Sequence, residues 1–378
     1  MFRPIEDDGD PDLALYNEEL KARGPTTWHN VEWLYGECYL YRRIGALFKC
    51  TQRWKDYDVF AQQKQSAFKS SIVAVVELAA KYRDIIQTSR ERASEHTEDD
   101  REAEERERLL FIEMCKICLW GNATDLSLLR DLSYDDIQKL QGSKAREESE
   151  KNILVSDLDD AFQRLRAAKT SNSSSQVTFV LDNAGFELLV DMILAGFLLD
   201  RRLATKVVFQ SKSMPWFVSD VVPKDFADLL NALAEPEAFF ASGDGYTNSE
   251  TSKSVFTENQ LADLKFMFEN FATLHGEGKL ILKSDRFWTQ PGSFWRMPHT
   301  APELFHDLQQ CQLVVFKGDL NYRKLTGDVS ATQLVILLAC TTSFMTVLTD
   351  LSLLILTSIV SPRHNGHPPP PSPAVLAR

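Results

Sequence analysis

The chain has 378 residues, 44% of them hydrophobic and 25% charged, a composition typical of a globular protein with a large core. Its formal net charge of −12 excludes a global attraction to nucleic acid or to an anionic membrane. Six cysteines are too few and too unevenly spaced for a disulfide framework, and no secretory signal precedes them. We therefore expect reduced thiols and a cytoplasmic or nuclear protein.

Residues 27–170 are predicted to form a helical region, after an N-terminal tail of residues 1–26. Apolar residues recur there at spacings of three and four, as in "SSIVAVVELAAKYRDII". Cys115 and Cys118 form a C-x-x-C pattern, but no second cysteine pair follows. The helical spacing around them favours two thiols facing the core over a zinc or redox site.

The sequence pattern changes from residue 171 onward. Segments with helical spacing separate three short apolar runs, which are "VTFVL" at 177–181, "KVVFQ" at 206–210 and "LVVF" at 313–316. This alternation predicts a parallel sheet with crossover helices.

Polar residues follow each of the three runs, at the end of a sheet where ligands usually gather. They are Asp182 and Asn183, the segment that ends at Asp220, and the segment 317–324. Because the carboxyl ends of parallel strands share one edge, we expect all three groups to face one crevice.

Two aspartates and an amide oxygen suit Mg²⁺ or Mn²⁺ better than a structural zinc ion. Four basic residues near them could supply the positive charge that a phosphate needs: Lys212, Lys317, Arg323 and Lys324. The alternative is that Asp182 and Asn183 form only a turn and a helix cap, that Glu187 only complements the helix dipole, and that Lys317 and Lys324 are surface lysines.

Six sequence blocks resemble the metal-dependent damage-control phosphatases. This family was formerly called domain of unknown function eighty-nine, and its eukaryotic branch is also called acidic residue methyltransferase-like. The most specific blocks are "LDNAGFEL" at 181–188, "PWFVSDV" at 215–221 and "FKGDLNYRKLTGD" at 316–328. Similar blocks lie at 27–43, 119–129 and 285–297.

The resemblance implies a three-layer α/β/α domain with a mostly parallel sheet over residues 171–328, beside a helical N-terminal region. It implies a Mn²⁺ or Ni²⁺ site and hydrolysis of small phosphorylated metabolites, such as fructose 1-phosphate, by a metal-bound water. The metal ligands then fall on Asp182, Asn183 and Asp220. The substrate contacts fall on Glu187, Asp319, Leu320, Asn321, Tyr322 and Arg323.

The resemblance leaves the proton acceptor open between Asp319 and Glu187, with Asp182 and Asp319 as the expected catalytic residues. In the block at 27–43, we expect Glu37, Arg42 and Arg43 to have structural roles. Asn122 and Asp125 could line the cleft or cap a helix.

Residues 329–378 depart from the family pattern. The family's Arg-Thr-x-Lys motif, whose lysine contacts the substrate phosphate, occurs nowhere in the chain. We therefore expect impaired phosphate binding and an unpaired edge of the sheet, and the hypothesis is a changed reading frame or a retained intron. The uncharged stretch 329–349 is long enough for a membrane segment, but its Ser and Thr content and Asp350 argue against one.

Two other classes of protein remain as alternatives, a protein carboxyl methyltransferase that uses S-adenosylmethionine and a non-catalytic remnant. The methyltransferase would need a glycine-rich loop after the first strand, and only the tail supports the remnant. A haloacid dehalogenase mechanism is excluded because position 184 is Ala where a second Asp is required. The expected partner is a small phosphorylated metabolite, and the sequence does not set the oligomeric state.

Overall fold

The computed structural model describes residues 1–95, 100–120, 153, 156–171, 173–241, 256–328, 353–358 and 374–377. Its longer helices are α1 (Leu13–Arg23), α2 (Trp33–Lys49), α3 (Ala61–Ser70), α4 (Ile72–Glu95), α5 (Asp100–Trp120), α8 (Leu158–Thr170), α9 (Phe186–Asp200), α10 (Pro223–Ala234), α12 (Glu258–Gly276), α14 (Pro302–Gln309) and α15 (Gly318–Thr326). Shorter helices are α11 (Pro236–Ala241) and α13 (Met297–Thr300).

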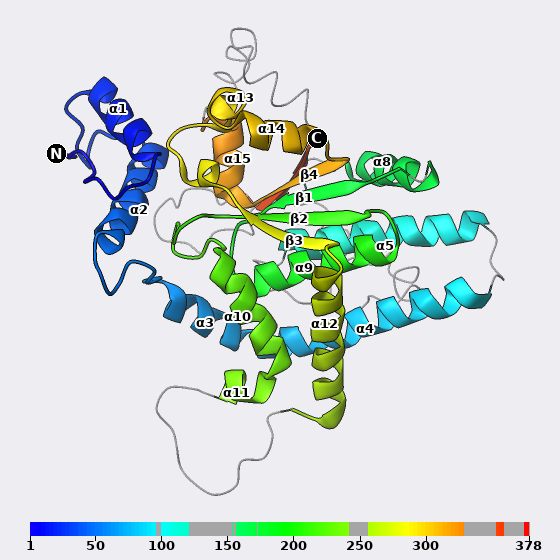
Figure 1. Ribbon diagram of the computed structural model, residues 1–378. Coiled ribbons are helices and arrows are strands. Elements are labelled where there is room, and N and C mark those ends of the chain that lie inside the picture. The colour runs from blue at the N-terminus through cyan, green and yellow to red at the C-terminus, as the bar shows by residue number, and fades with distance from the viewer. Residues whose placement is uncertain are drawn as a thin grey trace, which may run out of the picture.

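The strands form one sheet in the order β3-β2-β1-β4-β5-β6 (Figure 1). They are β1 (Gln176–Val180), β2 (Lys206–Ser211), β3 (Leu280–Ser284), β4 (Leu313–Lys317), β5 (Leu353–Ser358) and β6 (Ala374–Ala377). All neighbouring pairs are parallel except β5 and β6. The three apolar runs are thus confirmed as β1, β2 and β4, whereas β3, β5 and β6 were not predicted.

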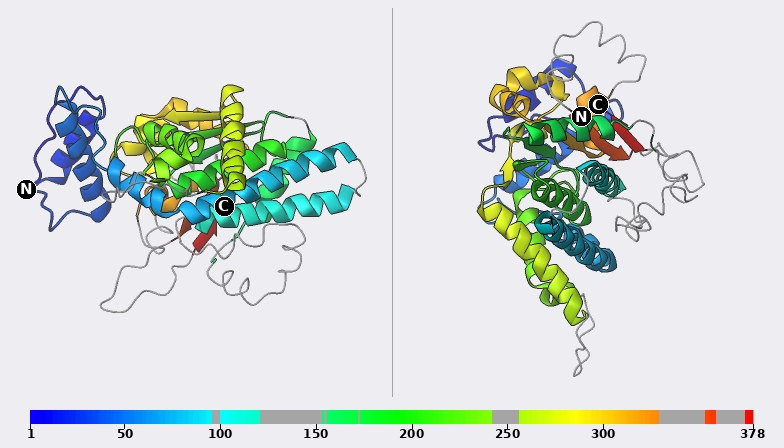
Figure 2. Two further views of the ribbon diagram at one scale, coloured as in Figure 1. Left: turned by 90° about the horizontal axis from the view of Figure 1, so that it is seen from below. Right: turned by 90° about the vertical axis from the view of Figure 1, so that its right-hand side faces the viewer.

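Both faces of the sheet are covered, so the domain has the three layers that were expected (Figures 1 and 2). Successive side chains of a strand point to opposite faces. Phe179 and Val315 therefore enter the core beneath α4, α5, α9 and α12, while Val180 and Phe316 pack on the side of α14. Helix α9 lies in the layer beneath the sheet (Figure 1), and every residue from 187 to 199 is buried, as expected for a helix that is apolar all round.

Helix α2 packs against the segments that follow β2 and β4. Tyr35 and Tyr39 share a core with Trp216 and with Leu320, which is in α15. The N-terminal region therefore lies over the carboxyl ends of the strands. The first 26 residues, expected to be a tail, contain α1.

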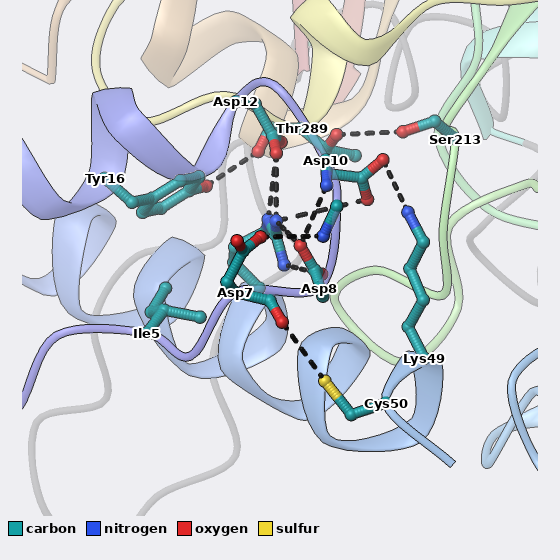
Figure 3. A network of polar contacts seen from close by, with 12 residues as sticks. Ile5, Asp7, Asp8, Asp10, Asp12, Tyr16, Lys49, Cys50, Ser213 and Thr289 are labelled. Atoms are coloured by element: carbon teal, nitrogen blue, oxygen red, sulfur yellow. Dashed lines mark hydrogen bonds and ion pairs between the residues drawn. The ribbon is translucent and has the colours of Figure 1, made fainter. Parts of the chain in front are cut away.

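The segment before α1 is bound to Arg42 of α2 through Asp8 and Asp12, both of which are labelled in Figure 3. The Arg42 guanidinium is fully buried and lies 2.7 Å from Asp8 Oδ2 and 3.0 Å from Asp12 Oδ1. Tyr16 also fixes this region, because its hydroxyl donates to the Thr289 carbonyl at 2.6 Å. Arg42 thus has the structural role expected of it, although it binds the N-terminal segment and not the sheet.

The tail contributes β5, which pairs in parallel with β4 from Val314 to Lys317. The expectation of an unpaired edge at this strand was therefore wrong. Over the described residues, no helix combines the length and the apolar character needed to span a bilayer. The stretch 329–349, considered above as a membrane segment, lies outside the described residues.

Candidate metal centre

The segments that follow β1 and β2 are held side by side by their backbones. Asn183 and Asp220 form an isolated antiparallel bridge. On either side of it, the Val221 amide donates to the Asp182 carbonyl at 2.8 Å, and the Ala184 amide donates to Ser219 at 2.7 Å. The three residues predicted as metal ligands therefore lie together.

The Asn183 side chain connects the acidic residues of the site. Its amide nitrogen donates to Asp182 Oδ2 and to Glu187 Oε2, both at 2.8 Å, and its oxygen accepts from Ser219 Oγ at 2.5 Å. The residue at the N-terminus of α9 is Gly185, and no side chain caps the helix there. The alternative reading of Asp182 and Asn183 as a helix cap is therefore wrong.

Helix α15 begins directly against Asp182. Gly318 has φ +80°, and a Cβ on it would lie 1.9 Å from Asp182 Oδ2. Only glycine allows the chain after β4 to pass this close in that conformation. The backbone after the third predicted strand thus forms one wall around the carboxylate.

The lysines near the site balance its carboxylates. Lys212 Nζ lies 3.2 Å from Asp220 Oδ2, and Lys317 Nζ lies 2.9 Å from Asp191 Oδ1 and 3.4 Å from Glu187 Oε1. Both ammonium groups are buried. Lys317 is therefore not a surface lysine, and neither residue has a free face to offer a phosphate.

The other two predicted cations differ from each other. Lys324 is buried and donates to the Gln290 carbonyl at 2.6 Å, and burial lowers its pKa. It is not a surface lysine either. Arg323 keeps 31% of its side chain exposed and pairs with Asp319 and Asp328 at 2.8 and 2.7 Å. Of these four cations, Arg323 is the one that solvent reaches.

Burial and mutual repulsion dominate the electrostatics of the acidic cluster. Burial, together with the charges of Glu187 and Asp220, raises the pKa of Asp182 well above its usual range. Burial also raises the pKa of Asp220 to about 6 in spite of the Lys212 charge. Carboxyl groups with such values hold their protons more tightly than exposed ones and are destabilised when ionised together.

The buried carboxylates of the site outnumber its buried ammonium groups, so a divalent cation could neutralise the excess negative charge. Four buried carboxylates are linked by these contacts to two buried ammonium groups, namely Asp182, Glu187, Asp191 and Asp220 with Lys212 and Lys317. When all are ionised, two negative charges are uncompensated. Within the described part of the chain, the buried Oδ2 of Asp220 accepts no aligned hydrogen bond. Hard oxygen donors and an excess of negative charge fit Mn²⁺, Mg²⁺ or Ni²⁺.

The expected ligand set contains only two carboxylates, because its third member is Asn183. Accordingly, the described residues hold no group of three His, Cys, Asp or Glu side chains arranged for a metal. Asp182 and Asp220 come from different strand ends, and the amide between them adds a neutral oxygen. Such a set would leave positions open for water and a substrate oxygen.

The expected substrate residues of α15 are divided between surface and core. Asp319 and Arg323 have 31% of their side chains exposed. Leu320 is buried against α2, and Tyr322 packs against the core beside α14. Asn321 is buried, and its amide donates to the Leu181 and Lys317 carbonyls. Asp319, Tyr322 and Arg323 therefore keep partial access to solvent, whereas Leu320 and Asn321 do not.

The sequence did not predict that Asp191 belongs to the site or that Cys118 contacts Asp191 and Lys317. Cys118 Sγ lies 2.9 Å from Asp191 Oδ1, and Lys317 Nζ donates to the Cys118 carbonyl at 2.7 Å. The sequence feature that could have indicated Asp191 is its place as the one acidic residue in the apolar helical segment "LLVDMIL" at 188–194. Cys115 and Cys118 are both buried, which confirms that they face the core. Asn122 and Asp125 lie outside the described residues.

Comparison with known proteins shows which family the chain matches. Residues 8–350 match the family described as the damage-control phosphatase ARMT1-like domain. The chain belongs to this family. The ARMT1-like match runs past Asp328 to residue 350, so it also corrects the expectation that nothing after Asp328 resembles the family.

Curated relatives of this ARMT1-like chain carry the name damage-control phosphatase ARMT1. The protein from Xenopus tropicalis is 36% identical over 321 residues, and that from Homo sapiens is 33% identical over 318 residues. Each match covers 83% of this chain and 64% of the relative, so the chain spans less than two thirds of their length. A solved structure of a DUF89 family protein from Pyrococcus horikoshii aligns over 97% of this chain and 88% of its own at 15% identity, with a TM-score of 0.42, which is too low to argue from.

Proposed function

We propose that this ARMT1-like chain hydrolyses small phosphorylated metabolites, with a sugar phosphate such as fructose 1-phosphate as the first candidate, at a Mn²⁺- or Ni²⁺-dependent site. The observation that carries the proposal is the backbone bridge between Asn183 and Asp220, which brings the oxygen donors of two strand ends together beside Asp182. When bound, a divalent ion would polarise a phosphoryl oxygen and acidify a water molecule.

The residues of the chain would hold this ion and orient the substrate. Asp182, Asn183 and Asp220 would be its ligands, and Lys212 would keep the Asp220 carboxylate in place. Arg323 is the accessible cation and can grip a phosphate oxygen with two parallel hydrogen bonds. This role does not require the Arg-Thr-x-Lys lysine that the chain lacks.

We assign the proton acceptor to Asp319 in preference to Glu187. Asp319 follows the glycine that touches Asp182, and its exposure lets it pass a proton to solvent. Glu187 is buried and already accepts from Asn183. We expect Asp319→Asn to lower kcat by about 10²-fold or more, with a smaller effect on KM.

Phosphate release from fructose 1-phosphate tests the function, measured with Mn²⁺, with Ni²⁺ and with chelator. We expect metal-dependent turnover that Asp182→Ala and Asp220→Ala each abolish. Asp307→Ala is the matched control, because the Asp307 side chain is 56% exposed and lies at the surface 3.1 Å from Lys283 Nζ. Folded protein without metal-dependent turnover would refute the proposal.

Calorimetric titration with Mn²⁺ tests the ligand assignment without any reaction. The unsubstituted chain and Asp307→Ala should bind the ion, and Asp182→Ala and Asp220→Ala should not. Equal Mn²⁺ affinity in all four proteins would contradict the assignment even if turnover were observed.

A further inference from the structure

Two arms extend from the metal centre and meet at one aromatic residue, Trp33. The first arm is α15, which begins at Gly318 beside Asp182 and carries Arg323. The Arg323 guanidinium lies over the Trp33 ring, 5.1 Å from its centroid. Trp33 thus stands next to the cation to which we assign phosphate binding.

The second arm is the loop that follows β2 and carries Asp220. The ring of Phe217 in this loop meets Trp33 edge-on, with centroids 6.0 Å apart and planes at 73°. Phe217 also stacks on Tyr41 of α2, with centroids 4.9 Å apart. Trp33 therefore touches both segments that surround the metal centre.

The loop is held in a conformation that costs free energy. Phe217 and Val218 have φ values of +41° and +68°, which are unfavourable for side chains of this size. Such outliers persist only where surrounding contacts enforce them, and they gather at functional sites. The contacts of Phe217 with Trp33 and Tyr41 are available to enforce this conformation.

Trp33 is fixed in position but not covered. It is the first residue of α2. Contacts with Arg323 and Phe217 hold the ring, yet 47% of the residue stays exposed. A rigid aromatic surface that keeps an open face is suited to stack against a ring-shaped ligand at low entropic cost.

We propose that Trp33 is a specificity-determining residue whose exposed indole contacts the organic group of the substrate, favouring phosphomonoesters that carry a ring, such as the cyclic form of a sugar. This inference rests on the proposed phosphatase function and adds the class of leaving group. The apolar C–H face of a sugar ring packs on the indole while Arg323 holds the phosphate. A small acyclic phosphomonoester such as 2-phosphoglycolate has no ring face to pack on the indole.

The test compares two substrates and four proteins. The substrates are fructose 1-phosphate and the acyclic 2-phosphoglycolate, and the proteins are the unsubstituted chain, Trp33→Leu, Trp33→Phe and Trp54→Leu. Trp54 is the matched control, because it is 54% exposed and meets Tyr57 in the connection between α2 and α3.

We expect Trp33→Leu to raise KM for fructose 1-phosphate about tenfold with little change in kcat, on the scale of an aromatic contact. Its KM for 2-phosphoglycolate should not change, Trp33→Phe should recover most of the loss, and Trp54→Leu should behave as the unsubstituted chain. An equal effect of Trp33→Leu on both substrates, or none on either, would overturn the proposal.

Tryptophan fluorescence separates this inference from the phosphatase function. Fructose 1-phosphate should quench the emission of the unsubstituted chain in the presence of Mn²⁺, and Trp33→Leu should lose that quenching. Quenching without turnover would refute the phosphatase function and leave the contact with Trp33 standing. Turnover without a difference in quenching between these two proteins would refute the contact with Trp33 and leave the phosphatase function standing.

Discussion

Gly318 lies so close to Asp182 that a Cβ on the glycine would stand 1.9 Å from the Asp182 carboxylate oxygen Oδ2. We expect Gly318→Ala to lower the free energy of unfolding by about 3 kcal/mol or more and to weaken Mn²⁺ binding at least tenfold, because both the φ of +80° and the contact oppose a methyl group. Urea denaturation and calorimetry would measure the two effects.

Gly278→Ala is the control for this substitution. Gly278 also has a positive φ, +69°, but a Cβ there would meet nothing within 4 Å. Gly278→Ala should lower the free energy of unfolding by only about 1 kcal/mol, the cost of a positive φ for alanine, and should leave the Mn²⁺ affinity unchanged. If the two alanine variants behaved alike, the contact with Asp182 would have no role in the site.

The ion pairs of Arg42 predict a large loss of stability when this side chain is removed. Arg42→Met would leave Asp8 and Asp12 buried without their partner, so we expect the free energy of unfolding to fall by about 3–5 kcal/mol in urea denaturation. The neighbouring Arg43→Met is the control and should lower the free energy of unfolding by no more than about 1 kcal/mol, because Arg43 is only half-buried and donates to the neutral Tyr39 hydroxyl. A similar small loss for both would contradict this account.

Asp191 gives the metal-free protein a predictable dependence on pH. Burial raises its pKa in the folded state to about 6, whereas the usual value is 3.8. Between these values the folded state binds the proton more tightly than the unfolded state, so the free energy of unfolding falls as pH rises from about 4 to 6. Asp191→Asn should remove this contribution, which is on the order of 2 kcal/mol.

The measurement is urea denaturation in chelator at pH 4.5, 5.5 and 7. As pH rises, the unfolding free energy of the unsubstituted chain should fall relative to that of Asp191→Asn, which lacks this titrating group. A difference that is constant over this range would show that Asp191 has the same pKa in both states.

The pairing of β5 with β4 predicts the effect of removing the tail. Deletion of residues 329–378 would leave the backbone groups of β4 along Val314–Lys317 unpaired, which favours association between exposed strand edges. Light scattering should then detect aggregates. Deletion of 359–378 alone keeps β5 and should aggregate less, and a monomeric 329–378 deletion would refute the role of this strand.

The sequence predicted three of the four inner strands of the described sheet, β1, β2 and β4, and missed the inner strand β5 and the edge strands β3 and β6. β1, β2 and β4 are continuous apolar runs because both of their faces are buried. In β3, Lys283 and Ser284 are exposed, so the apolar run is too short to distinguish from a loop. β5 and β6 lie in the tail, where the change in composition suggested a break from the fold.

The proximity of Asp182, Asn183 and Asp220 could be predicted from the sequence because these residues follow strands, and parallel strands share one edge. The partners of Lys317 could not be found in this way. Lys317 meets Asp191 and Cys118, which lie far away in the chain and come from two different helices. Only the packing of α5, α9 and β4 determines that this lysine is buried.

The central place of β1 in the sheet also determines when the site can form during synthesis. Val177 of β1 pairs with Leu313 of β4, so one edge of β1 has no partner until the ribosome has made the segment between them. At typical rates of translation this interval is on the order of ten seconds. Throughout it, Asp182 is present without the backbone of Gly318 beside it, and the nascent chain exposes an apolar strand edge. Chaperones that bind such edges would therefore act on this protein before Gly318 lies beside Asp182.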